Sequence, residues 1–541
     1  MGRTALAVLF LFAALSLCAC SSRVSTDDIR SDLAADHLAA LTEKFEEAHI
    51  EHHELVTALN WARALQLQGR WQESITAYNY GIEILEEYEN RAIINMRGIL
   101  QTTGSILLTR GSEEYFGTGY ERSLLHTMNA MNYMMLGDFE GAAVEMRRME
   151  IRQEMWLAEE AQRLQQFLEE NKGNYDGDLS SLPSGYSMAS VLNSPEVRAV
   201  AAGYQDPFSY ALSAITCRLA EDYQYAGVSL RRAALLNENA RELFTRAWNL
   251  DDKGKARNEE WHPRIPQLPP ANHALAAGSS GTAQGDSTAT ATASPARTTQ
   301  TTANTRGKAQ KDGQEVVIIV MSGLAPAMHM EQVRIPAPYI GYLMIDLPSY
   351  VSAVRPSLPG IEFSGLAATT GTGKSAGRAA SATSAASAAS ATSGGTAHSE
   401  SPRPYQLLNT ELLAYRVLRD EVRYEIGSAI SRALVRAAVS GGAYAIAKSH
   451  EDTEAFAPLI GLVANVIMDV FATTTSQSVR NWEMLPAAGY LCMGSVERGG
   501  SVRIALGHRE SEVTLPPEAR GVVIFVSQTT NATMRVDYVT Y

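Results

Sequence analysis

The segment from Thr118 to Trp156 constrains the fold most, because its apolar residues recur at helical spacing on both sides of a turn signal. Before the turn they stand at i, i+4, i+7 and i+11, which is one face of a helix: Leu124, Met128, Met131 and Met135. After the turn they include two alanines, which let two helix axes approach closely: Phe139, Ala142, Ala143 and Met146. Gly137 suits a left-handed helix stop, and Asp138 suits the cap of the next helix. The segment therefore predicts a tightly packed helical hairpin.

The centre of this hairpin resembles the tetratricopeptide repeat (TPR). In Leu136–Ala142 a Leu-Gly pair is followed by an aromatic residue and then by alanine, at the spacing of that repeat. Looser copies occur at Leu67–Ser74, two periods of about 34 residues earlier, and at Ala220–Ala226, with a degenerate unit expected at Ala92–Leu108. The resemblance implies a TPR-like α-solenoid, a fold that binds partners and rarely does chemistry.

Changes in composition divide the 541-residue chain into predicted domains. Residues 29–262 predict a TPR-like all-α domain. Residues 263–313, rich in Ala, Gly, Ser and Thr, have no apolar periodicity and predict a disordered linker. Residues 314–541 predict an α+β domain with a low-complexity insertion at about 366–402. The predicted protein is therefore multidomain, with an α-solenoid followed by a smaller α+β domain.

The predicted α+β domain begins with a β-branched run, Glu315–Met321, that indicates a buried strand. Met330–Ile335 and Tyr339–Leu347 predict two further extended segments. Tyr405–Ile446 and Phe456–Phe471 predict helices, and the second is too short to span a bilayer, so a buried helix is expected. Four more strands are predicted towards the C-terminus: Gly489–Met493, Val502–Leu506, Val522–Val526 and Met534–Val539.

The N-terminus predicts secretion. Arg3 followed by the apolar run Ala5–Leu17 is typical of a signal peptide and is too short for a permanent membrane span. Leu17-Cys18-Ala19-Cys20 then resembles a bacterial lipobox, with a small residue before the acceptor cysteine. The alternative is an ordinary signal peptide that is cut nearby.

The lipobox resemblance implies a lipid anchor. It implies that residues 1–19 are removed, that Cys20 acquires acyl chains such as palmitate, and that residues 20–28 form a lipidated tether. Several chains anchor firmly, since each buried methylene contributes ~0.8 kcal/mol. Ser21 after the acceptor cysteine implies the outer membrane, with the protein facing the periplasm or exposed on the cell surface.

The net charge of the chain limits the class of partner that it can bind. The net charge of −13 argues against a nucleic-acid partner, because phosphate binding needs clustered Lys and Arg.

Once Cys18 and Cys20 are assigned to the signal peptide and the anchor, Cys217 and Cys492 remain. An oxidising envelope would permit a disulfide between them. They lie in different predicted domains, however, and two buried free thiols are the favoured interpretation.

Five polar residues of the hairpin are candidates for partner binding: Asn129, Asn132, Tyr133, Arg148 and Arg152. Asparagine is a poor helix former and needs a compensating partner. On the inner face of a repeat it can grip a peptide backbone, and the alternative is an internal cap or an interhelix hydrogen bond. The two arginines could hold an acidic partner in a concave groove, or form i, i+4 ion pairs on a solvated face.

No arrangement of residues predicts catalysis, a cofactor or a metal. Ala368–Ser375 resembles a phosphate loop but lacks its first glycine and leads into low-complexity sequence. His49, His52 and His53 share a predicted helix face at a spacing that could hold a metal, yet a solvated polar face is favoured. The chain is therefore not expected to be an enzyme.

Several longer stretches resemble a family of largely uncharacterised bacterial lipoproteins with a TPR-like helical half. The matching pieces lie within Gly119–Tyr133, Gly137–Arg148, Ser322–Pro326 and Arg480–Pro486. The resemblance implies a role in the cell envelope and brings no catalytic residues.

The sequence thus favours a membrane-anchored scaffold that binds envelope proteins, with a linker that lets its two halves sample different separations. One alternative is an envelope hydrolase or carbohydrate-binding protein with a site near Trp482 and the Ser322-Gly323 turn. A third interpretation is a surface antigen or adhesin.

Overall fold

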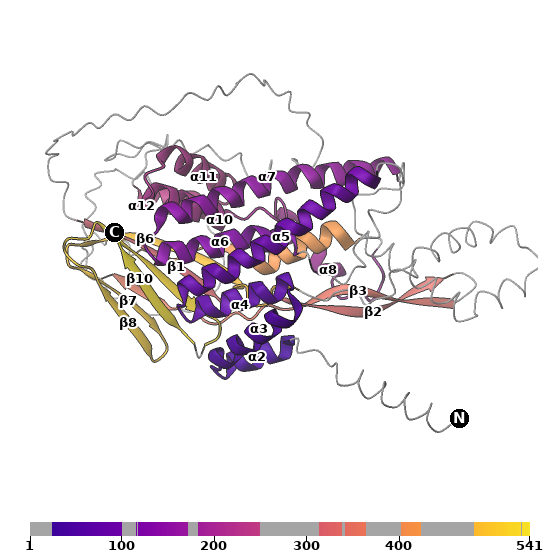
Figure 1. The fold of residues 1–541 in the computed structure, drawn as a ribbon, viewed down its shortest axis with the longest axis horizontal. Helices are drawn as coiled ribbons and strands as arrows, with labels where there is room; N and C mark the ends of the chain where they lie inside the picture. The colour runs from indigo at the N-terminus through magenta and orange to yellow at the C-terminus, as the bar shows by residue number, and fades with distance from the viewer. Residues whose placement is uncertain are drawn as a thin grey trace, which may run out of the picture.

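The computed structural model describes residues 24–99, 115, 117–170, 182–248, 313–337, 341–363, 402–422, 481–531 and 533–541. The predicted signal peptide, Cys20, most of the linker and of the low-complexity insertion, and Phe456–Phe471 lie outside these residues. Figure 1 shows helices gathered over a sheet, with a two-stranded ribbon that projects from one end.

Helices dominate the described residues up to position 248. They are α2 (Thr26–Ala34), α3 (Leu38–His52), α4 (Leu55–Leu67), α5 (Trp71–Ile99), α6 (Gly119–Met135), α7 (Phe139–Glu170), α8 (Ala189–Leu192), α9 (Pro195–Ala199), α10 (Pro207–Leu219), α11 (Tyr223–Leu236) and α12 (Glu238–Ala247). Residues 410–422 are also helical.

The helical hairpins predicted at three turns are present as α4–α5, α6–α7 and α10–α11. At the first two turns Gly69 and Gly137 take left-handed backbone angles, with φ of 72° and 77°. At the third turn Glu221 takes this position with φ of 61°. Asp138 caps α7 as predicted, since its carboxylate accepts a hydrogen bond from the backbone nitrogen of Gly141 at 2.8 Å. The N-terminal half is therefore a layer of paired helices.

The C-terminal half contains three sheets in its described part. The strands are β1 (Gly313–Ser322), β2 (Ala327–Ala337), β3 (Gly341–Val351), β4 (Gly360–Phe363), β5 (Tyr405–Asn409), β6 (Ala488–Glu497), β7 (Ser501–Leu506), β8 (Arg509–Thr514), β9 (Gly521–Gln528) and β10 (Arg535–Thr540). The main sheet has the order β10-β9-β1-β6-β5, β4-β7-β8 form a second sheet, and β2-β3 form the ribbon. Within the main sheet β1 and β9 are parallel, and the other pairs are antiparallel.

The main sheet has a hydrophobic core on each face, because successive side chains of a strand point to opposite sides. On one face β1 joins the core that contains the helices, through Val317, Ile319 and Met321. On the other face it joins the core shared with β7 and β8, through Val316, Ile318 and Val320. The main sheet is therefore the middle layer, between the helices and the smaller sheet.

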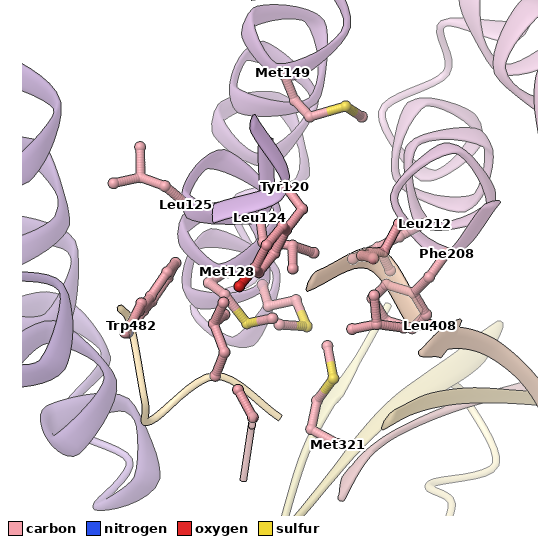
Figure 2. Packing of buried hydrophobic residues seen from close by; sticks show 14 of the residues in the cluster. Tyr120, Leu124, Leu125, Met128, Met149, Phe208, Leu212, Met321, Leu408 and Trp482 are labelled. Carbon is pink, nitrogen blue, oxygen red and sulfur yellow. The ribbon is translucent and has the colours of Figure 1, made fainter. Parts of the chain in front are cut away.

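Figure 2 shows the helix-side core, in which Tyr120, Leu124 and Met128 of α6 face side chains from α10 and the sheet. At Gly489 of β6 this packing leaves no room for a side chain. A Cβ atom at Gly489 of β6 would lie 2.9 Å from the Cβ of Leu408 and 3.1 Å from the ring of Phe208. A larger residue there would separate α10 from the sheet.

Direct contacts also join the two halves. Arg218 of α10 donates hydrogen bonds to both carboxylate oxygens of Glu315 in β1, each at 2.8 Å. The rings of Trp71 and Phe525 meet edge to face with centroids 5.8 Å apart. The described parts of the two halves thus form one packed unit, in contrast to the expectation that their separation varies. The domain limits that fall outside the described residues stay predictions.

Three local expectations differ from the structure. Tyr405–Asn409, expected to begin a helix, is strand β5, because it pairs with the open edge of β6. Helix α2 begins at Thr26 instead of Ile29, because Ser25 and Asp28 form a capping box. The expected unit at Ala92–Leu108 does not start a new helix, since α5 continues to Ile99 and residues 100–108 are not described.

The expected strands agree with β1 and with the ribbon, and towards the C-terminus with β6, β7, β9 and β10. Two strands of the smaller sheet, β4 and β8, were not expected. None of the described helices is both long and apolar enough to cross a membrane.

Candidate functional site

The five candidate partner-binding residues all lie on the α6–α7 hairpin, but they differ in exposure. Asn129 and Asn132 are completely buried, and Tyr133 is partly buried over the backbone of α7. The Arg152 side chain is 13% exposed, whereas that of Arg148 is 54% exposed. Of the five, Arg148 is the residue that faces outwards.

Asn132 joins three helices. Its side-chain oxygen accepts a hydrogen bond from Gln66 of α4 at 2.7 Å, and its side-chain nitrogen donates to the hydroxyl of Ser74 of α5 at 2.8 Å. The Ser74 hydroxyl in turn donates to the carbonyl of Ala62 at 2.7 Å. Each buried polar group here has a partner, as burial requires.

Asn129 makes a similar contact one helical turn away. Its side-chain nitrogen donates to the side-chain oxygen of Asn79 in α5 at 3.1 Å. For Asn129 and Asn132 the structure therefore shows interhelix hydrogen bonds, which the sequence analysis gave as the alternative to binding a partner's backbone.

A buried arginine lies beside this network. Arg63 of α4 donates a hydrogen bond to the side-chain oxygen of Gln66. Burial lowers the pKa of the Arg63 guanidinium to about 10, which leaves it protonated at neutral pH. No sequence signal distinguishes Arg63, because it occupies an otherwise ordinary helical pattern.

His126, Glu145 and Arg148 form a second polar group between α6 and α7. The Nδ1 of His126 lies 2.8 Å from one carboxylate oxygen of Glu145, and Arg148 donates to the other at 2.8 Å. Burial lowers the pKa of His126, although Glu145 opposes this effect. Burial would raise the pKa of Glu145, but His126 and Arg148 together lower it. The arrangement is therefore a neutral imidazole that donates to an ionised carboxylate.

The Nε2 of His126 has no hydrogen-bond partner within the described residues. Because the side chain is completely buried, this nitrogen faces packed atoms instead of solvent. The pair resembles the acid–base pairs of hydrolases in composition, but in this conformation no substrate can reach it.

Arg152 connects α7 to α5. It forms ion pairs with Glu86, at 3.0 Å, and with Glu89. The expected alternative to partner binding was an i, i+4 pair along one helix, whereas the partners of Arg152 lie on a neighbouring helix. The pairing of Arg148 with Glu145 is an i, i−3 contact within α7. Both arginines thus have acidic partners inside the protein.

The outward face of α7 carries an apolar row. Val144, Ile151 and Met155 are 43%, 56% and 45% exposed, and with Arg148 they stand at i, i+4, i+7 and i+11. These four residues therefore form one line along the helix, here called the α7 stripe. Apolar residues this exposed at helical spacing are a candidate contact surface.

Glu150 holds a further buried cluster that the sequence analysis missed. It accepts hydrogen bonds from Ser213 of α10 at 2.9 Å and from Ser229 of α11 at 2.5 Å. Arg232 donates to its second oxygen at 2.8 Å. Burial raises the pKa of Glu150 despite these donors. The sequence signal that could have predicted this cluster is the presence of serines on the otherwise apolar faces of α10 and α11.

The proposed hydrolase or carbohydrate site is closely packed in this structure. Trp482 is completely buried, and its ring meets Tyr78 edge to face with centroids 5.9 Å apart. At the Ser322-Gly323 turn, a Cβ atom at Gly323 would lie 2.0 Å from the carbonyl oxygen of Val354. Neither the indole nor the turn is placed to contact a sugar.

His49 and His53, at the end of α3, are packed with aromatic rings. His49 stacks on Trp61 with centroids 4.8 Å apart, and the Nδ1 of His53 lies 2.7 Å from the hydroxyl of Tyr80. His53 also has a left-handed backbone angle after the end of α3, which removes it from the helix face it was expected to share. Among the described residues no cluster of His, Cys, Asp and Glu could hold a metal ion. Ala368–Ser375 lies outside these residues.

The two cysteines behave as predicted. Cys217 and Cys492 are buried free thiols, and burial raises the pKa of each to about 12. They belong to different clusters, one between α7, α10 and α11 and one between the two sheets.

Comparison of this chain with protein families, with curated proteins and with solved structures finds no match.

Proposed function

We propose that this protein is a lipid-anchored protein of the bacterial outer membrane that acts as a protein-binding scaffold through TPR-like helical hairpins. The lipobox at Leu17–Cys20 supports the anchor. The paired helices support the binding role, because such layers present extended surfaces to partners. The observation that carries the binding role is the α7 stripe, an apolar row on the outward side of a helix.

The chemistry of the α7 stripe favours a helical partner. Its residues follow one line along α7, so the side chains of a second helix could pack between them. Arg148 lies in this line and is half exposed while it contacts Glu145 on its inner side. An acidic residue of the partner could approach its outer side. We therefore propose an amphipathic helix with an apolar face and an acidic residue, supplied by an envelope protein.

Photocrosslinking in intact cells tests the binding surface. A photoreactive amino acid at Ile151 is compared with the same group at Leu235 of α11, which is 53% exposed. We expect a discrete protein adduct from position 151 that is lost when Val144→Asp is added, because a charge would interrupt the stripe. Equal adducts from position 235, or an adduct that persists with Val144→Asp, would contradict the proposal.

A separate measurement tests the anchor. Cells that express the wild type and Cys20→Ser are fed an alkyne analogue of palmitate and then fractionated. The wild type should carry the label and sediment with membranes, and the variant should lose both properties. Label on the variant would show that Cys20 is not the acceptor.

A further inference from the structure

Helix α4 carries three buried polar residues one turn apart, and the middle one differs from its neighbours. Asn60, Arg63 and Gln66 stand at i, i+3 and i+6, so they lie on one side of the helix. The side-chain oxygen of Asn60 accepts a hydrogen bond from the backbone nitrogen of Met484 at 3.2 Å. Gln66 donates to the carbonyl of Met128 at 2.8 Å. Among the described residues Arg63 has one hydrogen-bond partner, Gln66 of its own helix.

Arg63 is also a buried charge without a counter-charge in the described structure. The residue is 1% exposed, and its guanidinium stays protonated at neutral pH because burial lowers its pKa no further than about 10. No described carboxylate forms an ion pair with it. Arg152, Arg218 and Arg232, by contrast, each pair with a glutamate. A buried charge that is neither paired nor solvated destabilises a fold strongly.

The titratable groups in this part of the core do not balance the charge. Burial raises the pKa of Tyr78, and the Arg63 guanidinium opposes this rise, so the two side chains lie close to each other. Because its pKa is raised, the Tyr78 hydroxyl remains neutral. Glu121 accepts hydrogen bonds from the backbone of Trp482 and from Thr118, and it does not pair with Arg63. The described side chains therefore leave the guanidinium charge unbalanced.

Three buried donors in the same region lack an acceptor. They are the Nε of Arg63, the hydroxyl of Tyr78 and the Nε1 of Trp482, and none has a hydrogen-bond partner among the described residues. The rings of Tyr78 and Trp482 meet edge to face with centroids 5.9 Å apart, and the indole lies within the helix-side core (Figure 2). Buried polar groups in folded proteins are nearly always hydrogen-bonded. A group of donors beside a cation therefore indicates an acceptor that carries a negative charge.

We propose that Arg63, Tyr78 and Trp482 form an internal binding site for a small monovalent anion, namely chloride. One negative charge balances one guanidinium, and a halide accepts hydrogen bonds without needing an acceptor in return. A water molecule would satisfy the donors but leave the charge unbalanced. The bound ion would join α4 and α5 to the segment that leads into β6, and so would hold the helices to the sheet half. The site requires neither the lipid anchor nor the α7 stripe.

Urea unfolding at different chloride concentrations tests the site. The full chain is purified in detergent, freed of chloride by dialysis against sodium gluconate, and unfolded at constant ionic strength while chloride replaces gluconate. A ligand that binds only the folded state lowers the unfolding constant, and above its dissociation constant each tenfold rise in chloride should lower that constant about tenfold. Bromide should act as chloride does, whereas sulfate, which is larger and doubly charged, should not. An unfolding constant that is independent of chloride would overturn the proposal.

Arg63→Met separates binding at this site from a general effect of salt. The substitution removes the charge and the donors but keeps a long unbranched side chain, so we expect no dependence on chloride. Arg70→Met, at an exposed arginine that pairs with Glu73, is the matched control and should respond as the wild type does. A chloride response that survives in Arg63→Met would contradict the assignment.

Tyr78→Phe provides the same test if Arg63→Met does not fold. It removes one donor and keeps the ring, so the chloride response should begin at a concentration about tenfold higher than in the wild type. A response at the wild-type concentration would show that the Tyr78 hydroxyl does not bind the ion, and the site as proposed would be wrong.

Anomalous scattering distinguishes an ion from a water molecule. Crystals of the full chain are grown with bromide in place of chloride, and diffraction is recorded at the bromine absorption edge. An anomalous peak within hydrogen-bonding reach of the Arg63 Nε and the Tyr78 hydroxyl supports the site. Density at that position without an anomalous peak would identify water, which overturns the proposal.

Discussion

One carboxylate oxygen of Glu121 accepts a hydrogen bond from the backbone nitrogen of Trp482 at 2.6 Å, across 361 positions of sequence. The other oxygen accepts from the backbone nitrogen and the hydroxyl of Thr118, at 2.6 and 2.7 Å. The same buried side chain therefore completes the cap of α6 and holds the segment that leads into β6. It couples the start of a helix to the sheet half of the protein.

Removing this carboxylate should destabilise both halves. We expect Glu121→Ala to lower the free energy of unfolding by about 3 kcal/mol, because the buried nitrogen of Trp482 and the two partly buried donors of Thr118 lose their acceptor. Glu121→Gln should lose about half as much, since its amide oxygen can still accept. Urea unfolding followed by tryptophan fluorescence measures both values. Glu140→Ala in the exposed first turn of α7 is the control, and an equal loss there would refute the assignment.

The two buried asparagines should differ in their effect on stability. Asn132→Ala removes two short hydrogen bonds and should lower the free energy of unfolding by about 2 kcal/mol. Asn129→Ala removes one contact of 3.1 Å and should cost about 1 kcal/mol. Neither change should alter crosslinking at Ile151. A loss of the adduct with a normal unfolding curve would instead restore both residues as partner contacts.

Asp206 should make stability depend on pH. Burial raises its pKa to about 6 although Ser209 donates to it at the start of α10. A raised folded-state pKa favours the protonated form, so this contribution is complete below pH ~4 and is lost as pH rises through 6. Asp206→Asn retains a capping oxygen and does not titrate. Its stability relative to the wild type should therefore increase by roughly 3 kcal/mol between pH 4 and pH 7. Parallel unfolding curves for the two proteins over this range would contradict the prediction.

The buried thiols should react after unfolding and not before. In a chain with Cys18→Ser and Cys20→Ser, Cys217 and Cys492 are protonated at pH 8 and covered by packed atoms. A chromogenic disulfide reagent should detect no thiol in the native protein and both thiols in denaturant. Leu235→Cys, at an exposed position, should react at once in the native state. Rapid reaction of the native protein without Leu235→Cys would show that the core around Cys217 or Cys492 opens in the native state.

Helical periodicity predicts the hairpins because each one depends on residues close together in sequence. The row from Leu124 to Met135 is buried as its spacing requires, and Gly137 ends α6 with a left-handed angle. The strands around Val317 and Val523 could be predicted equally well, since their sequences are continuous runs of β-branched residues.

Contacts between distant segments set the features that sequence could not predict. Tyr405–Asn409 becomes a strand because β6 offers an open edge, and no local signal records that edge. The partners of Asn132 lie on α4 and α5, at Gln66 and Ser74, so its hydrogen bonds could not be read from the α6 sequence. For the candidate site, the periodicity predicted the α6–α7 hairpin but not which of its side chains face outwards.

The position of β1 has a consequence for how the chain folds while it is synthesised. Ile319 pairs with Leu491 on one side and with Phe525 on the other. The surface on which the helices rest is thus incomplete until nearly the whole polypeptide has emerged, and its long-range pairings form slowly. A nascent chain of this topology therefore keeps both edges of β1 unpaired until β6 and β9 have been synthesised.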